Sequence, residues 1–225
     1  MNHLLTNPVY NALLSGDKNL SHGTSNVKYF DEEVSPFIGF DYGYEKGFSD
    51  LHDLLPRDRN ILYANPSPIA HPAGWKLLQE IKGLQFVYEG PEIKNEFPNA
   101  VALTTSNVDE MVQLATLTRP GPFASRTIEF GSYYGIFDDN KLIAMTGQRM
   151  HVENCTEISA VCTHPDHLGK GYAYTLLQHQ LQIILRNNQV PFLHVRGDNE
   201  RAIALYKRLG FIISRDMIFS FMKKE

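Results

Sequence analysis

The sequence contains little cysteine and little surplus charge. Only Cys155 and Cys162 are cysteines among 225 residues, and their odd separation along one strand would place them on opposite faces. A disulfide-stapled secreted domain is therefore excluded, and a reducing cytoplasm fits. The 25 acidic residues exceed the 21 basic ones, which gives a formal net charge of −4. This charge argues against a nucleic-acid partner, because such a partner requires a basic face.

Long apolar runs are also absent from the sequence. No stretch of about 18 apolar residues occurs, so no membrane-spanning helix and no membrane partner are expected. The segment Met1 to Pro8 lacks a basic start followed by an apolar core, so a secretory signal is not expected. The hydrophobic share of 43% and the charged share of 20% are ordinary for a globular protein. We expect a cytoplasmic globular protein of one large domain or two small ones.

The first hundred residues are rich in turn signals, such as Asn65-Pro66-Ser67-Pro68, and their expected strands are short. Three-residue spacing of Trp75, Leu78 and Ile81 predicts one helix in this part. The elements expected there are strands over 61–64 and 84–88 and a helix over 74–82.

The remaining residues alternate more clearly between helical and strand patterns. The expected helices cover 108–117, 171–186 and 199–209, and the expected strands cover 132–137, 142–146, 157–163, 192–195 and two short runs within 211–222. This order predicts a mixed α/β sheet. We divide the chain into an N-terminal α/β region over 1–100 and a second domain over 101–225.

A strand-to-helix loop, Thr163-His164-Pro165-Asp166-His167-Leu168-Gly169-Lys170-Gly171-Tyr172-Ala173, is the strongest local signal. The first amides of a helix have no carbonyl partners within the helix, and the helix dipole adds about half a positive charge there. Gly169 and Gly171 let backbone approach a ligand without an intervening Cβ. The loop therefore predicts a phosphate or diphosphate site.

Two other phosphate loops do not match this segment. A Walker loop needs Gly-Lys before Ser or Thr, but Lys170 is followed by Gly171. A dinucleotide fingerprint needs three glycines after the first strand of a βαβ unit, whereas this loop has two and comes late in the chain. Taken alone, the loop is also compatible with a plain strand-to-helix turn.

A second motif follows at Asp198-Asn199-Glu200-Arg201, where a polar cap opens a helix that contains Tyr206 and ends in Leu209-Gly210-Phe211. Loop and helix together resemble the GNAT superfamily of acyl-CoA-dependent N-acyltransferases, from about Thr104 to the C-terminus. The stretches 156–165 and 191–195 look most like its glycine-N-acyltransferase-like branch. The resemblance implies a GNAT-like mixed, mostly antiparallel sheet flanked by helices over 101–225, preceded by a smaller α/β region over 1–100.

The resemblance also implies how acetyl-CoA would bind. In the family, the strand before the loop bonds the pantetheine arm through its backbone, and the loop amides hold the diphosphate. The family's loop starts with Arg or Gln, where this chain has Leu168, and Lys170 could offset part of that lost donor. The cofactor-binding residues implied are Val161, Thr163, Gly169, Lys170, Gly171, Tyr172, Ala173 and Asn199.

Two catalytic residues are implied in the same way. A tyrosine on the last helix protonates the leaving thiolate in the family, and Tyr206 matches it. The amide of Val161 would bind the oxyanion, where the family's strand splays from its neighbour. Glu157 is the candidate general base, because strand alternation places it on the face of Val161. Some members use no such base, and Glu157 is also compatible with a polar residue on a half-exposed face.

Other polar residues have plainer interpretations. His164 and His167 lack a third ligand at helical spacing, so no metal is expected. Cys162 fits a small buried apolar role better than that of a nucleophile. The run from Arg119 to Arg126 lies where the family's acceptor loop runs. Arg126 could meet a carboxylate there, or the run could be a proline-stiffened turn with a solvated arginine.

These observations lead to one functional expectation and two alternatives. The resemblance implies an N-acetyltransferase that moves an acetyl group from acetyl-CoA to a primary amine of a small molecule or amino acid. A non-catalytic acyl-CoA-binding regulatory module is the alternative, favoured by the departure at Leu168, and a nucleotide-binding protein is a third. The acceptor, the acyl chain length and the oligomeric state, a homodimer included, stay open. Residues 1–100 could form a degenerate second copy, a lid or part of the acceptor pocket.

Overall fold

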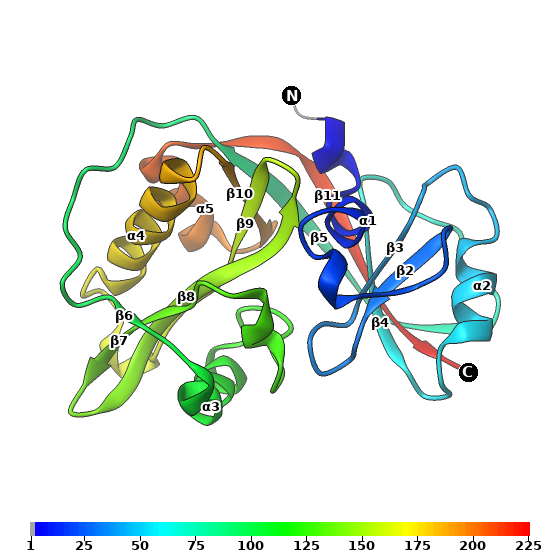
Figure 1. The fold of residues 1–225 in the computed structure, drawn as a ribbon, viewed down its shortest axis with the longest axis horizontal. Coiled ribbons are helices and arrows are strands. Elements are labelled where there is room, and N and C mark those ends of the chain that lie inside the picture. The colour runs from blue at the N-terminus through cyan, green and yellow to red at the C-terminus, as the bar shows by residue number, and fades with distance from the viewer. Residues whose placement is uncertain (1–2) are drawn as a thin grey trace.

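Eleven strands join into one sheet in the computed structural model, which describes residues 3–225 (Figure 1). The strands are β1 (Ser21–Gly23), β2 (Val27–Phe30), β3 (Phe37–Phe40), β4 (Asn60–Asn65), β5 (Trp75–Tyr88), β6 (Val101–Ala102), β7 (Tyr134–Asp138), β8 (Lys141–Val152), β9 (Cys155–Thr163), β10 (Val190–Arg196) and β11 (Phe211–Lys224). The α-helices are α1 (Pro8–Leu14), α2 (Gly47–Leu54), α3 (Val108–Thr118), α4 (Tyr172–Arg186) and α5 (Glu200–Leu209).

The strand order in the sheet is β1-β2-β3-β4-β11-β5-β10-β9-β8-β7-β6. Among the described residues, β3 with β4 and β9 with β10 are the parallel pairs, and the other neighbours are antiparallel. A parallel pair needs a crossover connection, and α2 and α4 supply these two. The expected mixed, mostly antiparallel sheet flanked by helices is confirmed.

The two halves of the chain share one order of elements around the long central strands β5 and β11. Each half has a helix, an antiparallel pair, a crossover helix, a parallel strand and a long strand. Each long strand also pairs with the crossover strand of the other half, β11 with β4 and β5 with β10. The first half therefore repeats the topology of the second, and Figure 1 shows α2 and α4 at opposite ends of the molecule. The boundary at residue 100 stays a prediction.

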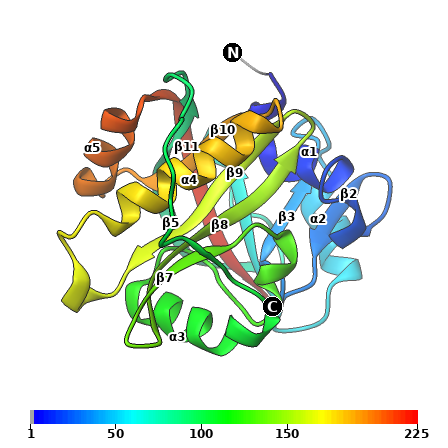
Figure 2. The same cartoon turned by 60° about the vertical axis from the view of Figure 1, so that its left-hand side comes forward.

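Apolar side chains form separate cores on the two faces of β9 and β10. One core joins α4 and α5 to the sheet and includes Ile158, Leu177 and Leu193. The other lies under α1 and α3 and includes Leu13 and Met111. Figure 1 and Figure 2 both show α4 and α5 side by side.

Two expected elements are wrong. The predicted helix over 74–82 is part of β5, and Leu77 and Leu78 on it are 43% and 45% exposed, so its apolar residues do not share one buried face. The two short strands expected within 211–222 are one strand, β11. Both errors have one cause, because β5 and β11 pair with each other over their whole lengths and long-range pairing overrides local propensity.

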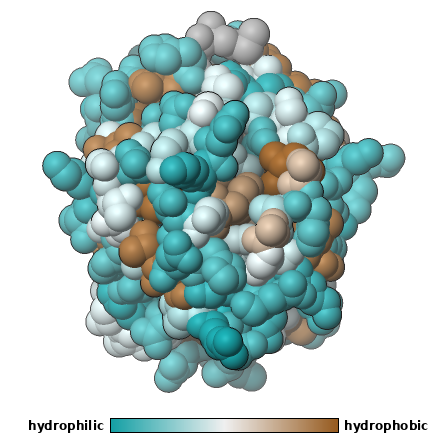
Figure 3. Space-filling model, turned by 90° about the vertical axis from the view of Figure 1, so that its right-hand side faces the viewer, coloured by the Kyte–Doolittle hydropathy of each residue, from teal (hydrophilic) through white to brown (hydrophobic). Residues whose placement is uncertain are grey.

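The face toward α2 carries mainly hydrophilic side chains, with apolar ones in small separate patches (Figure 3). Among residues 3–225, no helix is long and apolar enough to cross a membrane.

Candidate active site

A cleft of about 1000 Å³ opens where β9 and β10 separate. These parallel strands pair only over Cys155–Glu157 and Val190–Phe192, and beyond that point they diverge. We call one end of the cleft the loop end, lined by the glycine loop, the start of α4 and α5. We call the other the apolar end, which is lined by Phe37, Leu62, Ile81 and Phe219. The expected splay of the strand is therefore present, and it connects the two faces of the sheet.

A β-bulge in β9 changes which side chains share a face. Ser159 pairs with Gly147 and Cys162 with Met145, so Ala160 and Val161 together oppose one residue of β8. Ala160 has a φ of 52°, the left-handed conformation of a bulge residue. Val161 packs against the core under α4 and α5, whereas Ala160 and Cys162 join the core under α1 and α3. The alternation that placed Glu157 and Val161 on one face is therefore wrong.

The glycine loop presents open backbone to the loop end of the cleft. Gly171 is the N-cap of α4 with a φ of 84°, and Gly169 has a φ of 81°. A Cβ at either position would meet no atom within 4 Å, so space for a ligand remains there. The first amides of the fifteen-residue helix α4 start at this open space. The backbone here therefore leaves room for the predicted anion, and the anion site itself stays a prediction.

The equivalent turn in the first half is closed. Gly47 begins α2 after β3, but a Cβ there would lie 2.4 Å from the Phe40 ring, which fills the space. Asp41 and Glu45 precede this helix, and Lys46 at its N-cap offsets one of these two negative charges. An anion site is therefore geometrically available at α4 and not at α2.

Most of the predicted cofactor-binding residues line the loop end. Lys170 is the exception, because it is exposed outside the cleft with its Nζ 3.4 Å from Nδ1 of His167. Asn199 lines the cleft, and its side chain accepts a hydrogen bond from the amide of Ala202, 3.1 Å away, which caps α5. The others that line the cleft are Val161, Thr163, Gly169, Gly171, Tyr172 and Ala173.

Tyr206 lines the same cleft from α5. Its ring is buried edge-on against Phe86 and Phe211, each with a centroid 6.0 Å away. Among residues 3–225 its hydroxyl has no hydrogen-bond partner. Burial raises the pKa of this phenol, and the negative charge of Glu157 raises it further. The hydroxyl is thus a protonated donor at neutral pH, in reach of a ligand in the cleft.

Glu157 is held in a buried ion pair at the centre of the cleft. Its two oxygens accept hydrogen bonds from Nε and Nη2 of Arg149 at 2.8 and 2.9 Å. Nδ1 of His194 lies 2.8 Å from Oε1. Burial alone would raise the pKa of the Glu157 carboxyl, but the charge and hydrogen bonds of Arg149, together with His194, outweigh it and lower the pKa to about 2. A carboxylate of such low basicity is a weak proton acceptor.

Gln85 on β5 fixes the other side of His194. Its Nε2 donates to the carbonyl oxygen of Leu5 at 2.9 Å and lies 3.0 Å from Nε2 of His194. Because an amide nitrogen only donates, Nε2 of His194 accepts and its Nδ1 carries the proton toward Glu157. This assignment makes His194 a neutral link between Glu157 and Gln85.

We expect Glu157→Gln to destabilise the fold by about 3–5 kcal/mol, because Arg149 would remain buried without a counter-charge. The folded-state pKa of Glu157 lies below its ordinary 4.5, so its contribution is complete above that pH and is lost as the pH falls toward 2. Urea denaturation of the unsubstituted protein and of Glu157→Gln, at pH 7 and at pH 4, measures the loss of stability and its dependence on pH. The double variant Glu157→Leu with Arg149→Met should recover most of the loss, and a loss below about 1 kcal/mol in the single variant contradicts the assignment.

The sequence reasoning missed Arg149, His194 and Gln85. The available signal was that each is a polar residue within an otherwise apolar strand.

Arg126, considered for binding a carboxylate, already donates to Glu129 at 2.6 and 2.9 Å and to Asp31 at 2.9 Å. Residues 119–122 of that loop do line the cleft. Cys155 and Cys162 are both buried, and no disulfide joins them. Within residues 3–225, no three His, Cys, Asp or Glu side chains gather as a metal site would require.

Comparison with known proteins agrees with this fold. The model of the FR47-like protein family matches residues 133–220. A crystal structure of a GNAT-family protein from Novosphingobium aromaticivorans DSM 12444 is 34% identical to this chain, with a TM-score of 0.93 and all of both chains covered. No curated protein matches the sequence.

Two further structures share the fold at lower identity. A GCN5-related N-acetyltransferase from Kribbella flavida is 13% identical, with a TM-score of 0.61 over 96% of this chain and 94% of that one. A Drosophila protein is also 13% identical, with a TM-score of 0.65 over 97% and 89%. The 34% identity over the whole chain goes beyond shared fold, and the chain belongs to the GNAT family.

Proposed function

We propose that this protein is an N-acetyltransferase that moves an acetyl group from acetyl-CoA to a primary amine of a small molecule. The observation that carries the proposal is one continuous cleft through the strand splay, with an open helix N-terminus at one end and Tyr206 among the residues that line it. GNAT membership supports the reaction type. The glycine-N-acyltransferase-like branch and an amino-acid acceptor have no support from the site.

Acetyl-CoA fits the residues of the loop end. The amides from Gly169 to Ala173 would hold the diphosphate, and the edge of β9 over Val161 and Thr163 would pair with the pantetheine arm. Arg201 and Arg208 line the same end and add positive charge. Leu168, 48% exposed, offers no side-chain donor, so backbone amides supply most of the anion binding.

The reaction needs a neutral amine, a stabilised oxyanion and a protonated leaving group. The amine nitrogen attacks the thioester carbonyl, the carbon–sulfur bond breaks, and the nitrogen loses a proton to water while the sulfur gains one. The bulge amide of Val161 would donate to the oxyanion. The Tyr206 hydroxyl would donate to the leaving sulfur and recover its proton from solvent. A positioned acid of this kind contributes about 10²–10⁴ in rate.

We assign Glu157 a positioning role in place of that of a base. Its low pKa and its bonds to Arg149 and His194 leave it little tendency to take a proton. The amine then enters as the neutral free base, having lost its proton to water.

This assignment predicts a pH dependence set by the substrate. Glu157 is ionised throughout pH 5–9, because its pKa is about 2. We therefore expect log kcat/KM to rise with slope one up to the pKa of the amine, and to shift when an amine of lower pKa is used. Initial rates for two amines across that range test this. An inflection that is the same for both amines and disappears in Glu157→Gln would make Glu157 the base.

Thiol release from acetyl-CoA with a panel of primary amines tests the function itself. Release that depends on the amine supports the enzyme. Tight CoA binding with no release from any amine would instead establish the non-catalytic acyl-CoA-binding module, which the exposed Leu168 in the loop favours.

A further inference from the structure

The apolar end of the cleft is enclosed by hydrocarbon. Phe37, Leu62 and Phe219 are 1%, 5% and 9% exposed, and Ile81 is half-buried beside them. Phe37 and Phe219 pack edge to face with centroids 6.4 Å apart. Three of these side chains come from β3, β4 and β5, so the first half of the chain builds most of this wall. A group bound here exchanges water for apolar contact.

The charged groups beside this wall are already matched. The guanidinium carbon of Arg149 lies 4.8 Å from the centroid of the Phe37 ring. The same guanidinium donates hydrogen bonds to both carboxylate oxygens of Glu157. His194 is neutral, so the trio carries no net charge. Arg119 also lines the cleft, but it is an exposed residue at the end of α3. A carboxylate carried next to the reacting amine would lose its water here without gaining a partner among Arg149, Glu157 and His194.

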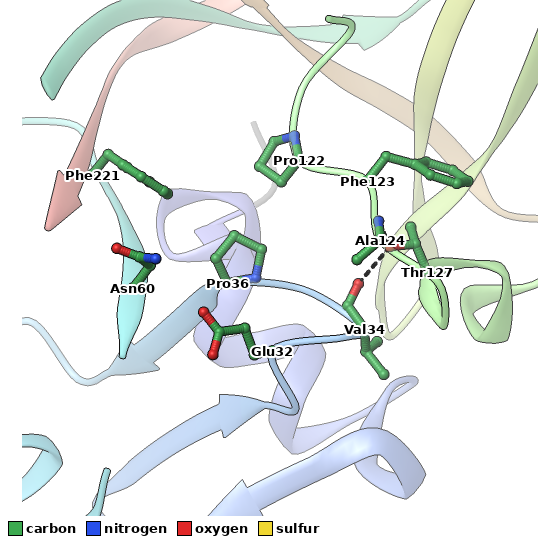
Figure 4. Close-up of a pocket in the computed structure, with 9 residues that line it drawn as sticks. All are labelled: Glu32, Val34, Pro36, Asn60, Pro122, Phe123, Ala124, Thr127 and Phe221. Atoms are coloured by element: carbon green, nitrogen blue, oxygen red, sulfur yellow. Dashed lines mark hydrogen bonds between the residues drawn. The ribbon is translucent and has the colours of Figure 1, made fainter. Parts of the chain in front are cut away.

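A second pocket of about 260 Å³ continues the same wall outward (Figure 4). Asn60 and Phe221 line it, each two residues along its strand from Leu62 and Phe219, and Pro122 borders both spaces. Figure 4 shows Pro122 facing Pro36 across this pocket, and to their right the Thr127 hydroxyl donates to the carbonyl of Val34 at 2.8 Å. Room for an extended substituent therefore lies beyond the apolar end.

We propose that the acceptor is a primary amine on an apolar aryl or alkyl body, without a carboxylate beside the amine, whose body lies against Phe37, Leu62, Ile81 and Phe219. This inference rests on the proposed function and deepens it. The amine nitrogen points to the strand splay, and the body points toward the second pocket. The transfer forms one amide bond, breaks one thioester bond and yields free CoA.

The test compares kcat/KM for matched amines in the acetyl-CoA thiol-release assay. 2-Phenylethylamine and phenylalanine differ only by the carboxylate, and we expect the former to be better by about 100-fold. From ethylamine to hexylamine we expect about a 4-fold gain per methylene that reaches the wall. Faster turnover of phenylalanine or glycine would overturn the inference and leave the proposed function standing. No thiol release from any amine, with CoA still bound, would overturn both.

Two variants keep the inference falsifiable at the level of residues. Ile81→Phe makes the apolar end of the cleft narrower, and we expect the ratio of kcat/KM for hexylamine to kcat/KM for ethylamine to fall by about 10-fold. Because both values come from one preparation, this ratio does not depend on the fraction of the protein that is folded. Leu78→Phe, on the same strand but 45% exposed and outside the cleft, is the matched control and should leave the ratio unchanged. Arg119→Ala should not alter the preference between 2-phenylethylamine and phenylalanine. An unchanged ratio in Ile81→Phe, or phenylalanine turnover that depends on Arg119, contradicts the proposal.

Discussion

Tyr206→Phe is expected to lower kcat by about 10²–10⁴ while the affinity for CoA stays within about 2-fold. The substitution removes only the hydroxyl, which has no hydrogen-bond partner among residues 3–225, so the fold loses little. The ring contacts with Phe86 and Phe211 remain. Stopped-flow thiol release at saturating substrates measures the chemical step, and calorimetry measures CoA binding.

Tyr88→Phe is the matched control for this prediction. Tyr88 is equally buried and packs on the same Phe211 ring, with centroids 5.2 Å apart, but it does not line the cleft. Its hydroxyl donates to the carbonyl of Pro91 at 2.6 Å, so its loss affects stability and not turnover. If Tyr206→Phe retained full kcat when chemistry limits the rate, the assignment of this phenol would be wrong.

Gly171→Glu is expected to reduce CoA affinity by about 1000-fold or more. A carboxylate about 4 Å from a diphosphate charge costs about 4 kcal/mol at an effective dielectric constant of about 20. The new side chain would also project into the open space that the ligand fills. Calorimetric titration with CoA measures the change in affinity. Gly171→Gln adds a side chain of the same size without the charge, so it separates the steric effect from the electrostatic one.

Gly131→Glu controls for backbone strain in this experiment. Gly131 has a φ of 88°, close to the 84° of Gly171, and likewise has no atom within 4 Å of an added Cβ. Its ψ of 176°, against 2° at Gly171, makes a side chain more strained there. Because Gly131 lies outside the cleft, its substitution carries at least as much strain without the anion. Equal CoA affinity in Gly171→Glu and Gly131→Glu would show that the diphosphate binds elsewhere.

The second half of the fold was predictable because its signals are local. The amphipathic pattern and the glycine C-cap placed α5, and the strand-loop-helix motif placed the start of α4 within one residue. Gly169 and Gly171 could be singled out because glycine tolerates a positive φ and, having no Cβ, lets a ligand approach the backbone closely. The same local rules failed for β5, where spacing of Trp75, Leu78 and Ile81 imitated a helix.

The centre of the site depends on contacts that no local pattern encodes. Alternation along β9 predicted a shared face for Glu157 and Val161, but the bulge at Ala160 separates them. The partners of Glu157 come from β8 and β10, and Gln85 comes from β5 in the other half of the chain. Their proximity is a product of the sheet order, which the sequence pattern does not contain.

The role of residues 1–100 follows from the same sheet. β5 lies between β11 and β10, and side chains of β3, β4 and β5 form most of the apolar end of the cleft. The Phe40 ring closes the first-half turn that corresponds to the glycine loop. We infer that the first half serves the acceptor and that the second half holds CoA.

A crystal structure with bound acetyl-CoA tests the central claim most directly. The account predicts the diphosphate on the amides of residues 169–173 and the thioester sulfur within about 3–4 Å of the Tyr206 hydroxyl, the range of a hydrogen bond to sulfur. A diphosphate bound away from α4, or a sulfur outside the splay between β9 and β10, would contradict it.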